Sequence, residues 1–547
     1  MEHYFNRLEK AIKENWDRPA LSNYGGETFT FGDLAANAAR FHIFFEEIGI
    51  RKGDKVALCA RNSARWGVSF ISITTSEAVV VPILSDFTPD SVAHLVDHSE
   101  SVALFTDADI WEKMDRSVIP GVRLVVNCAD FSLLYWEDEA IKAAYEELDN
   151  SFSIKYPNGF SAADVSYPKD NLQDLELINY TSGTTSAPKG VMITYGNLSS
   201  SVIFGVEGMP CDHNDNIVSM LPMGHIYGLV FEFLYTLCSG VHIYFLGKTP
   251  SPSLLLKALA EVKPYMIVTV PLVMEKIYKS SIKPVVEKWY MKLLLHTPLV
   301  GGIIYRKIGE KLLGAFGGNI RMIILGGAAF SPEVEKHFKR MGMPYTVGYG
   351  MTEAAPILAY DYWDRYVPGS CGSHICCTEI RIDSEDPEHI AGEILGRGTN
   401  ICIGYYKNPE ASEHLFTEDG WIHTGDLGVM DKEGHVFIKG RSKTMILSSS
   451  GQNIYPEEVE AVINSNDYVA ESVVVDRSGK LVALLYLDRD AIRRDKLDQE
   501  AASDIPERVM VNSNRQLPAY SRISKVEVMS APFEKTPKMS IKRFLYK

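Results

Sequence analysis

The chain has 547 residues, of which 46% are hydrophobic and 23% charged, with a formal net charge of −15. This length is too great for one hydrophobic core and predicts at least two domains. The acidic balance argues against a nucleic-acid partner and against an anionic-membrane surface. An anionic nucleotide would therefore have to be met by local lysines, arginines and a cation. The eight cysteines contain no C-x-x-C pair, which favours buried free thiols in a reducing cytosol.

The N-terminal residues 1–18 carry charges throughout and contain no signal-peptide core, so we expect a cytoplasmic protein. Two apolar segments, Leu229–Gly247 and Leu293–Tyr305, resemble membrane segments. The first contains Glu232 and divides into a short helix and a strand, and the second is too short to span a bilayer. We therefore expect no transmembrane segment and interpret both as core or pocket wall. A peripheral membrane contact through the second segment stays open as an alternative.

The N-terminal region alternates helices with short apolar strands. Thr30-Phe-Gly-Asp33 forms a capping box that predicts a helix ending at Gly49. Continuous apolar strands separated by helices predict mainly parallel sheets covered on both faces, in a large α/β domain. Ligands of such sheets bind beyond the carboxyl ends of the strands. The predicted strands are Lys55–Ala60, Val102–Thr106, Leu124–Cys128, Ile217–Leu221, Met266–Val270 and Met322–Leu325.

The pattern changes near Gly440. Glu471–Asp476 and Leu481–Leu487 predict a hairpin, and Pro456–Ile463 and Ile492–Leu517 predict helices. We place the boundary at residues 441–443. This gives an N-terminal domain of residues 1–440 and a small α+β C-terminal domain of residues 441–547.

One segment carries most of the functional information: Tyr180-Thr-Ser-Gly-Thr-Thr-Ser-Ala-Pro-Lys-Gly-Val191. It follows an apolar strand, Leu175–Tyr180. Glycines allow several backbone N–H groups to point into one concavity, and the hydroxyls and Lys189 add donors and charge, which suits a polyphosphate. The segment is not a Walker A loop, because G-x-x-x-x-G-K-S/T occurs nowhere in the chain. A solvated Ser/Thr/Gly linker is the alternative interpretation.

This segment resembles the signature loop of the AMP-forming acyl-CoA synthetases, in which glycine usually stands at the position of Ser186. Five further motifs resemble that family in order and spacing, and the resemblance extends from about Thr28 to the C-terminus. They are Gly326-Gly-Ala-Ala329, Tyr349-Gly-Met-Thr-Glu353, Gly420-Trp-Ile-His-Thr-Gly-Asp426, Gly440-Arg-Ser-Lys443 and Asn453-Ile-Tyr-Pro-Glu-Glu-Val-Glu460.

The resemblance implies a nucleotide site for ATP and Mg²⁺. Tyr349, with Gly350 beside it, would stack on adenine, Thr352 would contact the α-phosphate, and Glu353 would hold Mg²⁺, a cation that prefers oxygen ligands. Asp426 would accept hydrogen bonds from both ribose hydroxyls, and Arg441 would donate to the same sugar. The loop over the β- and γ-phosphates would comprise Thr181, Ser182, Gly183, Thr184, Thr185 and Lys189. Space for the adenine ring would be left by Gly326, Gly327, Ala328 and Ala329.

Three other positions follow from the resemblance. His225, in Leu221-Pro-Met-Gly-His-Ile-Tyr-Gly228, would line the entrance for the substrate carboxylate. Gly451 lies where the pantetheine arm of CoA would pass close to the backbone, although a plain turn is an alternative. Lys443 occupies the hinge about which a mobile C-terminal domain would rotate between two half-reactions. We expect Thr184, Lys189, His225 and Glu353 to act in the chemistry itself.

The C-terminus departs from the family. Aligning Thr536, Ile541 and Arg543 with its last motif puts Ser540 where a lysine that reaches the adenylate is usual. If residues 538–542 are extended, Lys538 and Lys542 share a face with Ser540, and either could substitute for the missing lysine.

The implied function is ATP-dependent activation of a fatty acid to acyl-AMP with release of pyrophosphate, followed by transfer to CoA. Ser251–Tyr278 is most similar to long-chain fatty acid–CoA ligases. Two alternatives remain. One is an acyl-adenylating ligase that delivers to an acyl carrier protein, and the other is a catalytically impaired nucleotide- or acyl-binding homologue marked by Ser540.

Overall fold

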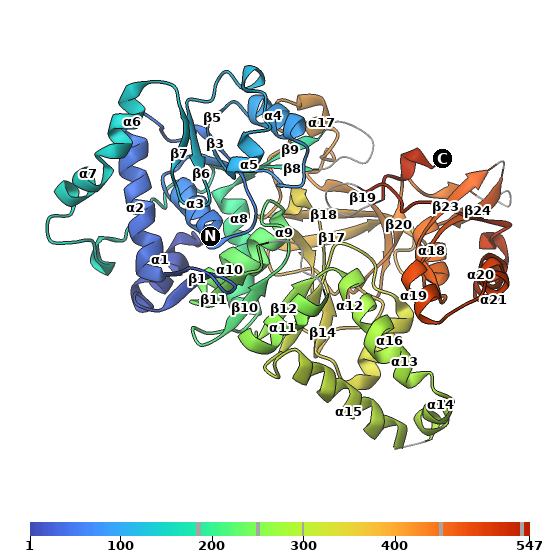
Figure 1. The fold of residues 1–547 in the computed structure, drawn as a ribbon. Coiled ribbons are helices and arrows are strands. Elements are labelled where there is room, and N and C mark those ends of the chain that lie inside the picture. Colours follow the sequence, from blue (N-terminus) through green and yellow to red (C-terminus); the bar gives the residue numbers. More distant parts are fainter. Residues whose placement is uncertain are drawn as a thin grey trace.

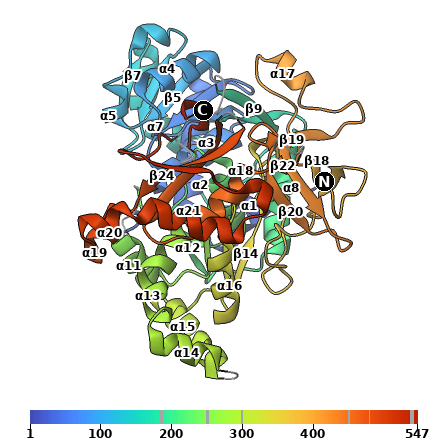
Figure 2. The same ribbon diagram turned by 90° about the vertical axis from the view of Figure 1, so that its right-hand side faces the viewer.

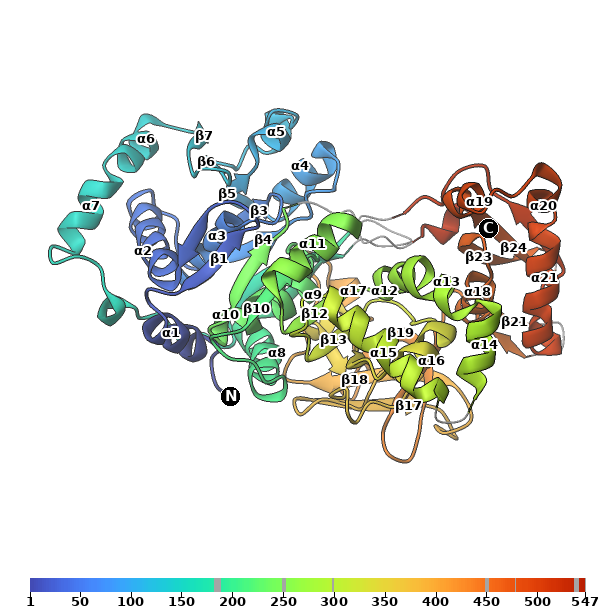
Figure 3. The same cartoon turned by 60° about the horizontal axis from the view of Figure 1, so that its bottom comes forward.

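The computed structural model describes residues 1–181, 188–247, 252–297, 300–447, 452–477, 479–535 and 541–546. A large body contains the N-terminal and central parts of the chain, and the C-terminal residues form a smaller unit at one end of it (Figure 1). When the molecule is turned, this unit stands opposite helices α6 and α7 (Figure 3). The eight cysteines all lie within the described residues and are free, and Cys376 is exposed.

The first large sheet has the strand order β7-β6-β5-β3-β4-β8-β9. Its central strands pair in parallel, whereas β7 and β9 at the two edges are antiparallel to their neighbours. The mainly parallel sheet is thus confirmed. Its strands are β3 (Lys55–Cys59), β4 (Val79–Pro82), β5 (Ser101–Thr106), β6 (Leu124–Asn127), β7 (Leu133–Trp136), β8 (Leu175–Thr181) and β9 (Lys189–Thr194).

The second large sheet has the order β14-β13-β12-β10-β11-β1-β2 and is parallel except for the β1–β2 pair. The predicted capping box opens α2, because the Thr30 hydroxyl accepts a hydrogen bond from the Asp33 N–H at 3.0 Å. The strands are β1 (Pro19–Asn23), β2 (Thr28–Thr30), β10 (Asn216–Ser219), β11 (His242–Phe245), β12 (Met266–Thr269), β13 (Met322–Leu325) and β14 (Tyr345–Val347).

Helices cover these two sheets and extend beyond them at the end formed by α14 and α15 (Figures 1 and 2). Short π-helical segments adjoin α9 and α12, at Leu229–Leu234 and Tyr278–Ile282. The α-helices of this body are α1 (Phe5–Glu14), α2 (Phe31–Glu47), α3 (Ala64–Thr75), α4 (Pro89–His98), α5 (Ala108–Trp111), α6 (Glu139–Glu146), α7 (Leu148–Lys155), α8 (Tyr195–Gly208), α9 (Ile226–Gly228), α10 (Tyr235–Cys238), α11 (Pro252–Val262), α12 (Pro271–Ile277), α13 (Lys283–Val286), α14 (Trp289–His296), α15 (Val300–Ala315), α16 (Pro332–Met341) and α17 (Pro409–Glu413).

An antiparallel four-stranded sheet completes the large body. Its strands are β17 (Thr378–Asp383), β18 (Gly392–Gly398), β19 (Ile422–Met430) and β20 (Val436–Arg441), and a small pair, β15 (Tyr349–Gly350) and β16 (Ile357–Ala359), precedes it. The apolar clusters of this body contain no residue beyond Val436 among those described, and separate clusters begin at Ile446. Independent cores on either side of residues 441–443 support the boundary that we propose.

The C-terminal unit is built on the predicted hairpin, which is confirmed as β23–β24 with β25 alongside. The predicted helical segment Ile492–Leu517 is three helices instead of one: the Asp498 side chain caps the second helix by accepting from the Ala501 N–H, and Pro506 lies in the first turn of the third. The elements are β21 (Ile446–Leu447), β22 (Asn453–Ile454), α18 (Pro456–Asn464), β23 (Val469–Arg477), β24 (Lys480–Leu487), α19 (Arg489–Arg494), α20 (Gln499–Ser503), α21 (Ile505–Gln516) and β25 (Lys525–Val528).

Three lysines of the large body contact the C-terminal unit, and one of them, Lys439 of β20, forms an ion pair with Glu458 of α18 at 3.3 Å. The Lys279 ammonium donates to the carbonyl of Asn464 at 3.0 Å, and Lys283 forms an ion pair with Asp467 at 2.6 Å. These contacts define the arrangement of the two units in this structure.

The two apolar segments that the sequence singled out differ in how far they are buried. Leu229–Gly247 is buried and divides into helix and strand as predicted. The expectation that Leu293–Tyr305 is core or pocket wall is wrong for part of its length: Leu295 and Tyr305 are buried, but Leu293 is 69% and Ile303 59% exposed. Among the described residues, no helix is both long and apolar enough to cross a bilayer.

Candidate nucleotide and acyl site

The two ends of the candidate phosphate loop lie side by side. Thr181 at the end of β8 pairs directly with Lys189 at the start of β9, and the Thr181 hydroxyl donates to the Lys189 carbonyl at 3.4 Å. Both residues line one large cavity. Ser182, Gly183, Thr184 and Thr185 lie outside the described residues. The hairpin register therefore places both residues that flank the candidate loop in the lining of the cavity.

Lys189 and Glu353 are joined through Tyr405, a residue that the sequence did not single out. The Lys189 ammonium lies 4.7 Å from the centre of the Tyr405 ring, and the Tyr405 hydroxyl donates to Glu353 Oε1 at 2.8 Å. Burial raises the pKa of Tyr405 well above its usual value, with Glu353 adding to the effect, so this hydroxyl stays a donor. A tyrosine in Gly404-Tyr-Tyr carries no pattern that marks it as part of a site.

The Glu353 carboxylate fits the requirements of a Mg²⁺ ligand. It is buried, follows Thr352 in a short 3₁₀ turn, and lines the same cavity as Lys189, to which Tyr405 joins it. Mg²⁺ is commonly held by one or two carboxylates together with substrate phosphates. A single carboxylate here is consistent with that donor set.

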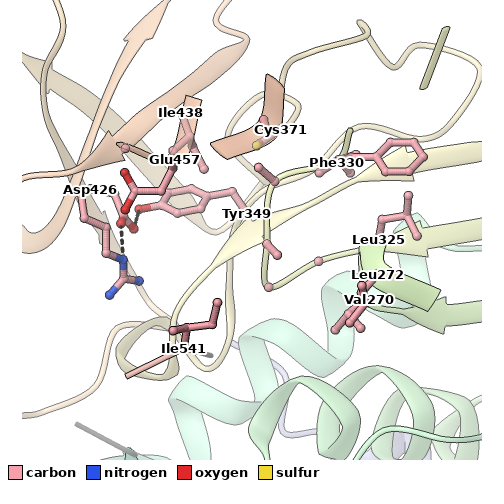
Figure 4. A pocket seen from close by; sticks show the side chains of 18 of the residues that line it. Val270, Leu272, Leu325, Phe330, Tyr349, Cys371, Asp426, Ile438, Glu457 and Ile541 are labelled. Carbon is pink, nitrogen blue, oxygen red and sulfur yellow. Dashed lines mark hydrogen bonds and ion pairs between the residues drawn. The ribbon is translucent and has the colours of Figure 1, made fainter. Parts of the chain in front are cut away.

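Asp426 lies at the centre of a polar cluster. Strand pairing places Arg441 directly opposite it, so that Arg441 Nε lies 3.0 Å from Asp426 Oδ1, while the Tyr349 hydroxyl donates to Oδ2 at 2.8 Å (Figure 4). Burial raises the pKa of Asp426, and the Arg441 guanidinium offsets part of this increase. Each carboxylate oxygen keeps lone-pair capacity beyond these bonds. The cluster can thus accept further hydroxyl donors.

Two glycines of the predicted site lie at close approaches, and at Gly350 the neighbour is backbone. A Cβ on Gly350 would lie 1.9 Å from the Pro356 carbonyl oxygen, and a Cβ on Gly326 would lie 3.0 Å from the Tyr227 ring. Gly326, Gly327, Ala328 and Ala329 follow β13, and all four line the cavity together with Thr352. The small side chains of Gly326-Gly-Ala-Ala329 thus suit a backbone segment that passes close to Tyr227 on one side and borders the cavity on the other.

His225 lies at the start of α9 and lines the same cavity. Its Nδ1 accepts a hydrogen bond from the Tyr227 N–H at 3.2 Å. Tyr227 in turn reaches the carbonyls of Thr269 and Ile324 at 3.5 and 3.4 Å, which ties this turn to the ends of β12 and β13. The histidine is therefore held in place by its own local backbone.

The cavity has a volume of about 3500 Å³ and two chemically different ends. Figure 4 shows Tyr349 between them. On one side lie Asp426 and Glu457, the latter a residue of α18 that the sequence did not assign a role. The other side is apolar and includes Val270, Leu272, Leu325 and Phe330. One ligand with a polar and an apolar end, or two ligands that meet, would match this division.

The C-terminal segment contributes only in part. Gly451, Lys538 and Ser540 lie outside the described residues. Lys542 forms an ion pair with Glu534 at 3.6 Å and is absent from the cavity lining. Arg543 does line the cavity and binds Glu460, a buried carboxylate. Burial raises the pKa of Glu460 to about 7, while Arg543 lowers it.

Lys443, the proposed hinge residue, lies in an exposed turn immediately after β20. Backbone hydrogen bonds link this turn to the large body and to itself: the Ser442 N–H donates to the Gly425 carbonyl and the Thr444 N–H to the Arg441 carbonyl. The turn thus joins the Asp426 strand directly to the C-terminal unit.

Comparison with known proteins agrees with this geometry. Residues 8–406 match the family model of the AMP-binding enzymes, and residues 443–546 match the model of the AMP-binding enzyme C-terminal domain. Long-chain-fatty-acid–CoA ligase 4 of Saccharomyces cerevisiae is 29% identical over 524 residues, covering 86% of this chain and 73% of the yeast protein. 4-Coumarate–CoA ligase 5 of Oryza sativa is 28% identical, covering 92% of this chain and 88% of the rice protein.

A solved structure shows the same fold. ATP-bound MatB from Rhodopseudomonas palustris matches with a TM-score of 0.76 and 23% identity, covering 100% of this chain and 98% of that one. The fold is the large α/β domain with a smaller C-terminal α+β domain expected from the sequence. Because the first family model spans well over half of the chain, this protein belongs to the AMP-binding enzyme family.

Proposed function

We propose that this protein activates a fatty acid with ATP and transfers the acyl group to CoA. The observation that supports this most directly is the single cavity that joins the Asp426–Arg441 cluster to the apolar wall at Val270 and Leu272. In the first step a carboxylate oxygen of the acid bonds to the α-phosphorus of ATP, and the bond to pyrophosphate breaks. In the second step the CoA thiol displaces AMP from the acyl carbon.

The polar residues would act by binding and orienting. Asp426 and Arg441 would hold the ribose, and Lys189 would balance the negative charge of the phosphates, which is the main requirement of phosphoryl chemistry. Glu353 would hold Mg²⁺, whose chemistry is to neutralise phosphate charge. His225 would contact the entering carboxylate. Gly451 would let the pantetheine arm of CoA pass close to the backbone, and Lys443 would be the hinge of the C-terminal unit.

The choice of acid is tested by measuring pyrophosphate release with fatty acids of graded chain length and with 4-coumarate. Each acid is assayed alone, with CoA, and with an acyl carrier protein. We expect release to require an acid, to increase with alkyl chain length, and to yield a thioester with CoA. Formation of ADP and orthophosphate would overturn the AMP-forming assignment, and a preference for 4-coumarate would overturn the fatty-acid assignment.

The serine at position 540 leaves two hypotheses, an active enzyme in which another lysine acts and an enzyme impaired in adenylation. We propose that Lys538 or Lys542 replaces the lysine expected there. Adenylation and thioester formation are measured separately in Lys538→Ala, Lys542→Ala and Ser540→Lys. Loss of adenylation in one alanine variant supports substitution. If neither loses activity and Ser540→Lys gains about tenfold or more, equal to about 1.4 kcal/mol of barrier, the enzyme is impaired in its first step. A cytoplasmic location stays an expectation.

A further inference from the structure

Helices α14 and α15 meet at an end of the large body and expose apolar side chains there. Trp289 is 80%, Leu293 69% and Ile303 59% exposed. Trp289 and Leu293 are four residues apart in α14 and therefore share one face of that helix. Tyr290 and Leu294, also four apart, widen this face and are 42% and 40% exposed. We call the exposed residues of 288–307 the α14–α15 tip.

The tip is a packed structure. A Cβ on Gly301 would lie 2.4 Å from the Leu295 carbonyl oxygen, so the two helices are in close contact. Leu295 and Tyr305 face inward, and the Arg340 guanidinium lies 4.0 Å from the centre of the Tyr305 ring. Figures 1 and 2 both show α14 at the lower extremity of the molecule. The apolar face is therefore held in place and points away from the body.

The charge of the tip is opposite to that of the whole protein. Residues 288–307 contain four basic residues and no aspartate or glutamate, in a chain of net charge −15. All four are exposed, and among the described parts of the chain none lies within ion-pair distance of a carboxylate. They are Lys288, Lys292, Arg306 and Lys307. Since charges beyond about 10 Å are largely screened in physiological solution, the local charge decides what the tip attracts.

We propose that the α14–α15 tip binds the surface of an anionic lipid bilayer. Tryptophan and tyrosine favour the headgroup level, Leu293 and Ile303 can enter the acyl boundary, and the lysines and arginine can contact lipid phosphates. Exposed apolar side chains flanked by these four cations, with Glu287 and Glu310 as the exposed acids next to them in the sequence, match this partner, because a bilayer offers negative charge over an apolar interior. The overall acidity of the sequence had argued against such a surface, and the local distribution of charge reverses that inference.

The proposal does not depend on the identity of the acid, and its test does not require catalysis. The full chain is mixed with phosphatidylcholine vesicles or with vesicles that also contain phosphatidylserine, and the bound fraction is measured by flotation. We expect binding only to the anionic vesicles. Lys288→Ala/Lys292→Ala should weaken it on the order of 30-fold, at about fivefold for each cation near an anionic surface. Trp289→Ser/Leu293→Ser should also weaken it.

Matched controls are available elsewhere on the surface. Lys113→Ala/Lys480→Ala removes the same charge from two other exposed lysines, and Ile154→Ser removes a side chain that is 71% exposed. Both should bind like the unaltered protein. Binding that the tip variants leave unchanged, or that the controls lose equally, overturns the proposal. The proposal is also overturned if the protein binds no vesicles but forms a dimer without lipid, and Leu293→Ser converts that dimer to a monomer. The face would then pair two copies of the chain.

Discussion

Asp426→Ala tests the nucleotide site most directly. The change removes a buried carboxylate that accepts from the Tyr349 hydroxyl at 2.8 Å and from Arg441 at 3.0 Å, and that we propose also accepts from the ribose. Each charge-assisted hydrogen bond contributes about 1.5–3 kcal/mol. Loss of two such bonds to the ribose should cost about 3–6 kcal/mol, or a 10²–10⁴-fold increase in the Kd for ATP.

The free energy of unfolding should change much less, by about 1–2 kcal/mol. Burial already disfavours the charged form of Asp426, which is why its pKa is raised, and the Arg441 side chain is 63% exposed and can be solvated without its partner. ATP affinity is measured by calorimetry and stability by thermal unfolding of the same sample. Tyr349→Phe is the matched control, because it removes only a competing donor to Asp426 and should change the affinity less than about tenfold. Near-normal ATP affinity in Asp426→Ala would refute the ribose role.

Three further changes test the hinge, the backbone contact and the core. Lys443→Pro should spare adenylate formation but slow thioester formation from acyl-adenylate, because proline fixes φ near −65° at the proposed pivot; equal loss in both half-reactions would contradict it. Gly350→Ala should destabilise the protein by about 1–3 kcal/mol in thermal unfolding because the new Cβ meets a carbonyl, whereas Gly314→Ala, with open space around it, should not. Burial raises the pKa of Glu232 from 4.5 to about 8, so the folded state retains a proton that the unfolded state releases, and stability should fall as pH rises across this interval. Glu232→Gln should flatten this dependence of Tm on pH, and an unchanged slope would show that Glu232 is ionised in the fold.

The parallel sheets and the strand that leads into the candidate phosphate loop were predictable because their signals are local. A continuous apolar run such as Met322–Leu325 removes all of its side chains from water only when the strand is buried on both faces. Thr30 and Asp33 cap a helix through atoms that are close in the sequence. Asp426 was singled out by the resemblance of its motif, and its role in binding ribose stays a prediction; it lies within strand β19.

The remaining features depend on contacts between distant segments. Tyr405 is positioned by its hydrogen bond to Glu353, which lies 52 positions earlier, and no sequence pattern links the two residues. Segment Leu293–Tyr305 has the composition of a core helix, but within the part of the chain that the structure describes no element covers Leu293 or Ile303, and coverage is a property of the folded chain. The helix breaks in Ile492–Leu517 occur at the Asp498 cap and before Pro506, positions that the apolar pattern does not mark.

Lys279 and Lys283 attach the C-terminal unit by two different chemistries. The Lys279 bond is to a neutral carbonyl, whereas Lys283 pairs with the carboxylate of Asp467, whose side chain is 55% exposed. Added electrolyte weakens the attraction between two opposite charges far more than a hydrogen bond to a carbonyl. Ionic strength should therefore loosen this ion pair and the exposed pair of Lys439 with Glu458 but leave the Lys279 bond, so that the small unit turns about a retained point instead of separating from the large body.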